Sequence, residues 1–232
     1  LRGAIPKNLR WPLLGIFALG GAQGYLGWYM VKSGLVDVPR VSPYRLAAHL
    51  GLALIVYALM FRVALGLLLA RVKSGSAIRH RVWPGGVMLT LVAVTIVLGA
   101  FVAGLRAGLM YNTFPLMGGQ FVPQGLLALH PAWTNFFENP VTVQFLHRVL
   151  ALTTLATALW VWWRMRKSAQ DRAQRRSRHA LVLMSMLQVT LGICTLLWIV
   201  PVWLGTLHQG GAVLLLSAVI AAGYCWTTIG AE

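Results

Sequence analysis

The chain has 232 residues, of which 58% are hydrophobic and only 10% carry a charge, whereas a typical soluble domain carries about 25% charged residues. Its formal net charge is +16, but no segment resembles an RNA- or DNA-binding module, so the charge does not indicate a nucleic-acid surface. Apolar runs of about 20 residues recur along the chain, each long enough to cross a hydrocarbon core of about 30 Å. They exclude a soluble fold and predict an all-α, polytopic membrane helical bundle.

These apolar runs predict six membrane spans. In chain order the spans cover residues 13–33, 45–70, 84–108, 141–164, 178–199 and 203–226. The second and fourth spans are preceded by a capping side chain and a proline suited to the first helical position: Ser42-Pro43 and Asn139-Pro140.

Basic residues gather in alternate connecting segments. Segment 71–81 holds four Lys or Arg residues, and segment 164–178 holds seven. Because positively charged loops stay on the cytoplasmic side of a membrane, both segments and both chain ends are predicted to face the cytoplasm or matrix. The connections 34–44, 109–140 and 200–202 are poor in Lys and Arg and are predicted to be external.

The longest connection, 109–140, is rich in proline, glycine and apolar side chains. This composition is too hydrophobic for a disordered linker. We therefore expect the segment to lie on the bundle as a lid or a re-entrant segment.

The first two spans repeat in the last two. Three residues of each span recur in its copy: Gln23, Leu26 and Gly27 match Gln188, Leu191 and Gly192, and His49, Gly51 and Ala53 match His208, Gly210 and Ala212. A duplicated helical unit is the simplest explanation. Because the third and fourth spans have no copy, the repeat predicts two further helices before residue 1, including a histidine equivalent to His147. The expected total is eight helices in two four-helix units, with residues 1–83 the remainder of the first and 84–232 the complete second.

Three of the six histidines lie inside spans at one depth. His49, His147 and His208 each stand about four to seven residues, or roughly 6–10 Å, from the external end of a span. Ionisable groups at this depth are costly and usually functional. A hydrogen bond to a neighbouring helix would explain one such histidine, but it does not explain three at the same level. The other three are assigned to loops, where solvation is the simpler interpretation: His80, His130 and His179.

Paired neutral imidazoles on facing helices favour heme iron, because a four-helix bundle can hold a porphyrin between two axial histidines. Zinc would require nearby Cys, Asp or Glu, and only Asp37 and Glu138 are external. A proton relay would require carboxylates inside the spans, which contain none. Arg148, beside His147, is suited either to a heme propionate or to lipid headgroups. Arg106 is similar, and the sequence leaves the roles of Arg106 and Glu138 open.

At these residues the sequence resembles heme A synthase of the CtaA type, a family of bacteria and mitochondria. The resemblance runs the length of the chain and is closest to the branch without an external cysteine pair. The matching stretches are residues 20–35, 44–50, 102–108, 111–117, 136–140, 144–148 and 208–212.

The resemblance implies an oxidoreductase that converts the C8 methyl of heme O to the formyl group of heme A for cytochrome oxidase. It implies a heme b held by His147 and His208, with Arg148 as a further heme contact, and heme O bound at His49. The catalytic glutamate and the partner of His49 are expected in a Glu-x-x-His-Arg motif upstream of residue 1. The chain as given is therefore expected to hold heme b without completing the oxidation.

The resemblance also implies partners and a location. Heme O is the expected substrate, and heme O synthase and an electron donor are the expected protein partners. Membrane lipids surround the spans, and a homo-oligomer stays open. The expected location is the plasma membrane, or the mitochondrial inner membrane in a eukaryote, with the heme sites near the external face.

Two alternative functions are kept. A bis-histidine cytochrome b that only transfers electrons explains the histidines equally well, but it does not explain the external segment 111–117. A transporter is the second alternative, because duplicated helical units are frequent in transporters. Parallel duplication and the lack of carboxylates in the spans argue against a transporter.

Overall fold

The computed structural model describes residues 5–34, 41–69, 84–167 and 172–227. Within these residues the chain is all-α, as predicted, with no β-strand. The helices are α1 (Lys7–Gly34), α2 (Pro43–Leu69), α3 (Gly85–Gly104), α4 (Pro140–Met165), α5 (Arg172–Leu197) and α6 (Val202–Thr227), with short 3-10 helices η2 (Ala107–Leu109) and η3 (Ala132–Phe136). Asp37, His80 and the basic segment 71–81 lie outside the described residues.

Five of the six long helices, α2 to α6, are long and apolar enough to cross a membrane. Helix α1 has 28 residues, which is sufficient length. It is less apolar, however, because six glycines and Gln23 dilute its apolar side chains and basic residues stand near both ends. The first predicted span is thus a helix of the right length that lacks a stretch as apolar as those of the other five.

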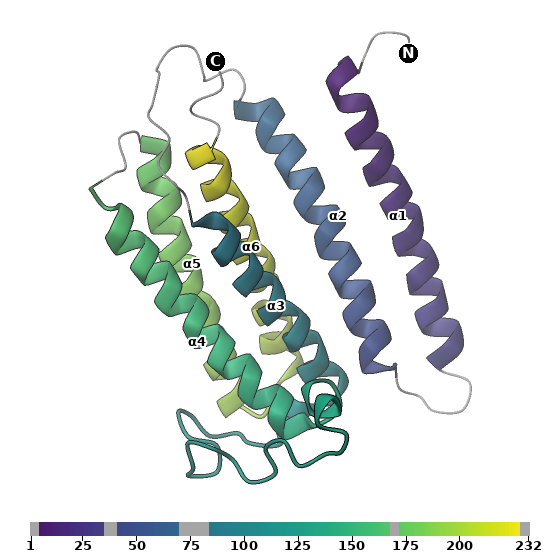
Figure 1. Cartoon of the computed structure of the whole chain (residues 1–232), viewed down its shortest axis with the longest axis vertical. Coiled ribbons are helices and arrows are strands. Elements are labelled where there is room, and N and C mark those ends of the chain that lie inside the picture. Colours follow the sequence, from purple (N-terminus) through teal and green to yellow (C-terminus); the bar gives the residue numbers. More distant parts are fainter. Residues whose placement is uncertain (1–4, 35–40, 70–83, 168–171, 228–232) are drawn as a thin grey trace.

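Helices α3, α4, α5 and α6 form a closed bundle, in which each helix packs against the next and α6 returns to α3. Helix α2 packs on the outside of this bundle against α3 and α6, and α1 packs against α2 (Figure 1). The described part of the chain is thus a closed four-helix bundle with one appended hairpin. The division into duplicated units stays a prediction.

Two apolar clusters fill the interior at different heights. The larger cluster lies toward the α4–α5 turn and includes Met88, Val161 and Leu181, which are fully buried. The smaller cluster joins α2, α3 and α4 near the opposite end, around Phe101 and Val143. Many apolar side chains on the outer helix faces remain exposed, as lipid contact requires.

The segment between α3 and α4 is folded onto one end of the bundle (Figure 1). Asn139 caps α4, since its Oδ1 accepts hydrogen bonds from the backbone N–H groups of Val141 and Thr142. The Asn139 Nδ2 donates to the Gly125 carbonyl and to the Asn135 Oδ1, both at 2.9 Å. This network fixes the segment on the bundle, as expected of a lid.

The two ends of the bundle differ in charge. The start of α1 and the turn between α4 and α5 lie at one end, and the folded segment 105–139 lies at the other (Figure 1). Basic residues occur at the first end in both places, among them Lys7, Arg10, Arg164 and Arg172. Which of the two ends faces the cytoplasm stays a prediction from loop charge.

Candidate functional site

The structure brings His147 and His208 together inside the closed bundle. Their ring centroids are 6.4 Å apart, and the ring planes are nearly perpendicular at 83°. The two histidines stand on α4 and α6, which are separated around the bundle by α3 on one side and α5 on the other. The rings therefore meet across the bundle interior.

The separation of the two rings suits a single metal atom. With metal–nitrogen bonds of about 2 Å, two opposed imidazoles would have ring centres about 6 Å apart. The described part of the chain contains no group of three or more His, Cys, Asp or Glu side chains able to hold a metal. Iron in a porphyrin already has four nitrogen ligands and requires only two imidazoles from the protein.

The His147 ring is fixed by α3. Its Nδ1 lies 3.0 Å from the Thr95 carbonyl oxygen, to which an Nδ1–H donates. This hydrogen bond leaves the lone pair on Nε2, the atom directed to a metal in many histidine sites. No described residue makes a hydrogen bond to that Nε2.

The His208 ring is fixed by α5. The Gln188 Nε2 donates to the His208 carbonyl at 2.9 Å and lies 3.2 Å from the ring Nδ1. The Nε2 of His208, like that of His147, has no hydrogen bond to a described residue. Both histidines thus keep the same ring nitrogen free for an axial ligand bond.

His49 stands on α2, outside the closed bundle. The Gln23 Nε2 donates to the His49 carbonyl at 3.1 Å and lies 3.4 Å from the ring Nε2. The other ring nitrogen, Nδ1, is buried without a hydrogen-bond partner. An unpartnered buried nitrogen is costly unless a ligand satisfies it. The ligand role of His49 stays a prediction.

Arg148 binds the external segment. Its Nη1 donates to the Thr113 carbonyl at 2.8 Å, and its Nη2 donates to the Tyr111 carbonyl at 2.7 Å. Gln144, one helical turn earlier, donates to the same Tyr111 carbonyl at 3.0 Å. Nothing in the sequence pattern around Arg148 predicts this anchoring role. The contact with a heme propionate stays a prediction.

Two of the remaining polar candidates, Glu138 and His179, have hydrogen-bond partners. Glu138 accepts a hydrogen bond from the Tyr44 hydroxyl at 2.7 Å, which joins α2 to the folded segment. Arg106 follows α3 with a left-handed backbone, φ 53°. His130 is exposed in the folded segment, as predicted. The loop assignment of His179 is wrong, because α5 begins at Arg172 and His179 lies within it.

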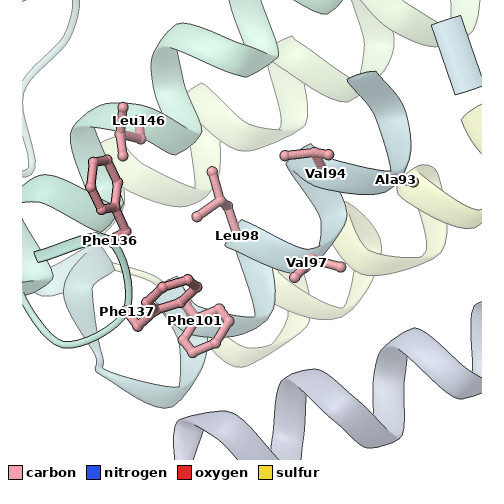
Figure 2. Close-up of a pocket in the computed structure, with 8 residues that line it drawn as sticks. All are labelled: Ala93, Val94, Val97, Leu98, Phe101, Phe136, Phe137 and Leu146. Carbon is pink, nitrogen blue, oxygen red and sulfur yellow. The ribbon is translucent and has the colours of Figure 1, made fainter. Parts of the chain in front are cut away.

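An apolar pocket of about 440 Å³ lies between α3, α4 and the folded segment. Figure 2 shows residues of α3 on one side of this pocket, with Leu146 of α4 and Phe136 and Phe137 of the folded segment on the other. Its lining is wholly apolar and includes Leu146, the residue before His147.

Comparison with known proteins gives a consistent family. The COX15-CtaA family, described as "Cytochrome oxidase assembly protein", matches residues 1–220. A heme A synthase of Nitrosospira multiformis is 46% identical over 95% of this chain and 62% of its own length. Heme A synthases of Parvibaculum lavamentivorans and Nitrosomonas eutropha are also 46% identical, over 94% and 95% of this chain and 60% and 63% of theirs. This chain thus spans about three fifths of these relatives. No solved structure matches.

Proposed function

The chain belongs to the COX15-CtaA family of cytochrome oxidase assembly proteins, and we propose that it acts in heme A synthesis, with a heme b held between His147 and His208. The observation that carries this proposal is the convergence of the two imidazoles across a closed four-helix bundle. The names of the relatives, all heme A synthases, support the same function.

The proposed roles of the protein groups follow from their contacts. A bound heme supplies electron-transfer chemistry at its iron. The Thr95 carbonyl and the Gln188 amide orient the two axial histidines. The buried apolar cluster around Val161 keeps water away from the cytoplasmic side of the site. Arg148 is proposed to contact a propionate while it anchors the folded segment.

The substrate part of the proposal concerns the α1–α2 hairpin. We assign residues 1–83 to the substrate unit and 84–232 to the heme b unit. In this assignment His49 binds heme O as an iron ligand. The reaction assigned to the whole protein is the oxidation of the C8 methyl of heme O to a formyl group.

The proposal extends to partners and location. Heme O synthase is the enzyme class that would supply the substrate, and an electron donor would serve the heme b unit. Since the most similar relatives named above are bacterial, the location proposed is the plasma membrane. The five apolar helices support a membrane location of this kind.

The heme b assignment is tested with His147→Ala, after the protein is expressed in a membrane with heme supplied. The low-spin heme absorption is expected to disappear, because one axial ligand is removed. His130→Ala is the matched control and is expected to keep the spectrum of the unaltered protein, since His130 is exposed in the folded segment. A normal low-spin spectrum in His147→Ala, or strong bleaching in His130→Ala, would refute the assignment.

A cytochrome b that only transfers electrons is a second candidate, because the bis-histidine site lies wholly within the α3–α6 bundle. Extracted pigment separates the two functions. Co-expression of the full-length protein with a source of heme O should yield formyl heme if the protein is a synthase, and unmodified heme alone if it only transfers electrons. A purified protein with no heme absorption would instead favour a transporter.

A further inference from the structure

Each of the three histidines in the spans packs against a glycine on the preceding helix. A Cβ added at that glycine would fall 2.9, 3.1 and 2.9 Å from the ring Cε1, for Gly27 against His49, Gly99 against His147, and Gly192 against His208. By contrast, a Cβ added at Gly24, Gly86 or Gly205 would meet nothing within 4 Å. The close approach of the rings thus depends on the missing side chain at three particular positions.

A polar contact to the same histidine stands four residues before each glycine. The contacts are Gln23 to His49, Thr95 to His147, and Gln188 to His208. Residues four apart lie on the same face of a helix, one turn from each other. We call each pair a histidine seat: Gln23 with Gly27, Thr95 with Gly99, and Gln188 with Gly192.

The seat on α3 shows why the glycine is required. The Thr95 hydroxyl donates to the Leu91 carbonyl at 2.7 Å, so the Thr95 contact to His147 is made by its own carbonyl. In an α-helix this carbonyl also accepts from the N–H four residues later, which is that of Gly99. A side chain at Gly99 would stand beside that carbonyl and push the imidazole away from it.

In the seat on α5, a glycine of α6 also packs closely, against the Gln188 side chain. A Cβ added at Gly211 of α6 would overlap the Gln188 Oε1, so Gly211 makes room for the amide that contacts His208. Glycine is less favourable than alanine within a helix. Its presence at Gly99, Gly192 and Gly211 is explained by the close contacts and not by helix propensity.

We propose that Gly99 and Gly192 are positioning residues, which set the angle and depth of the His147 and His208 rings through the histidine seats. Gly27 does the same for His49. The proposal rests on the proposed function in one respect, since a bound heme reports the ring geometry most directly. The contacts themselves are made by this chain alone.

The test compares Gly99→Ala and Gly192→Ala with two controls, Gly86→Ala on α3 and Gly205→Ala on α6. The protein is expressed in a membrane with heme b supplied, and its low-spin absorption and electron paramagnetic resonance spectrum are recorded. Changes to the groups that orient a metal ligand typically lower metal affinity by about 10- to 100-fold. Both seat variants are expected to lose about tenfold in heme affinity and to shift the resonance signal, which is sensitive to the angle between the imidazole planes. The controls are expected to match the unaltered protein.

Two outcomes separate this proposal from the proposed function. If both seat variants keep normal affinity and an unchanged resonance signal while His147→Ala loses its heme, the seats are refuted and the heme site stands. If the unaltered protein binds no heme, the proposed function fails, and the seats are judged in heme-free protein instead. There, nitrogen NMR of labelled histidine should show His147 protonated at Nδ1, and Gly99→Ala should remove that signature. An unchanged spectrum in Gly99→Ala would refute the seat on α3.

The melting temperature of the heme-free protein shows whether a variant loses heme because it is unfolded. The helix propensity of alanine offsets part of the cost of displacing the ring, so both seat variants should stay folded and unfold at a temperature close to that of the unaltered protein. A loss of heme binding without a loss of stability is what a positioning role requires. A loss of heme binding that follows a general loss of stability would contradict that role.

Discussion

The hairpins α1–α2 and α5–α6 make the same local contacts in different surroundings. In both, a glutamine amide donates to the histidine carbonyl and a glycine one turn later faces the ring. His208 meets a second imidazole across a closed bundle, whereas His49 lies on a hairpin packed outside that bundle. The glutamine approaches Nδ1 of His208 but Nε2 of His49. The same histidine seat therefore forms in both hairpins. The two rings differ in their surroundings, since only His208 faces a second imidazole.

A second difference lies beside the glutamine. Gly211, three residues after His208, makes room for the Gln188 amide, whereas the residue three after His49 is Leu52. The amide in the first hairpin is accommodated without a glycine at that position. The two copies are thus not interchangeable, and substitutions at matched positions should separate them.

The largest expected difference is between His208→Ala and His49→Ala. His208→Ala should abolish the low-spin heme b spectrum, since it removes an axial ligand, and His49→Ala should leave that spectrum intact. Absorption of the membrane-expressed protein with heme b supplied measures both. If the two variants bleach equally, the hairpins share one heme, and the contrast drawn between them is wrong.

A smaller difference is expected between Gln188→Ala and Gln23→Ala. Loss of the Gln188 amide frees the His208 ring to rotate, and a change of this kind around a metal ligand lowers affinity by about tenfold or more. Gln23→Ala should not change heme b affinity, because its partner is His49. Heme titration of each variant gives the ratio directly. Equal affinities would show that Gln188 has no orienting role.

The smallest effect concerns the contact between the two hairpins. The Tyr57 hydroxyl and the Ser217 hydroxyl are 2.6 Å apart and join α2 to α6. Tyr57→Phe should lower the free energy of unfolding by about 1 kcal/mol, the usual contribution of one such bond. Ser217→Ala and the double variant complete a cycle measured by thermal unfolding. Additive effects in the cycle would mean that the hydroxyl pair does not couple the two hairpins.

The sequence predicted the parts of this site that side chains and repeats reveal. The common depth of His49, His147 and His208 and the copied Gln and Gly residues were visible because the first hairpin has a second copy in the chain. The seat on α3 was missed, since α3 and α4 have no copy here to compare with. Thr95 acts through a backbone carbonyl, which every residue type possesses.

Other features could not be predicted from apolar runs. Helices α1 and α5 begin at Lys7 and Arg172, about six residues before the predicted spans, because a helix can continue past the hydrocarbon core into a basic turn. The anchoring of Arg148 depends on where the carbonyls of Tyr111 and Thr113 lie. Those positions follow from the folded segment as a whole and not from its composition.

The two hydrogen bonds of Arg148 link the folded segment to the histidine site. Arg148 directly follows His147 in α4. Residues 111–113 of the folded segment are therefore hydrogen-bonded to the helical turn that carries the imidazole. Any molecule that displaces residues 111–113 must break two charge-assisted hydrogen bonds next to the His147 ring. A molecule that displaced residues 111–113 from this end of the bundle would therefore disturb the helical turn that carries His147 without entering the bundle itself.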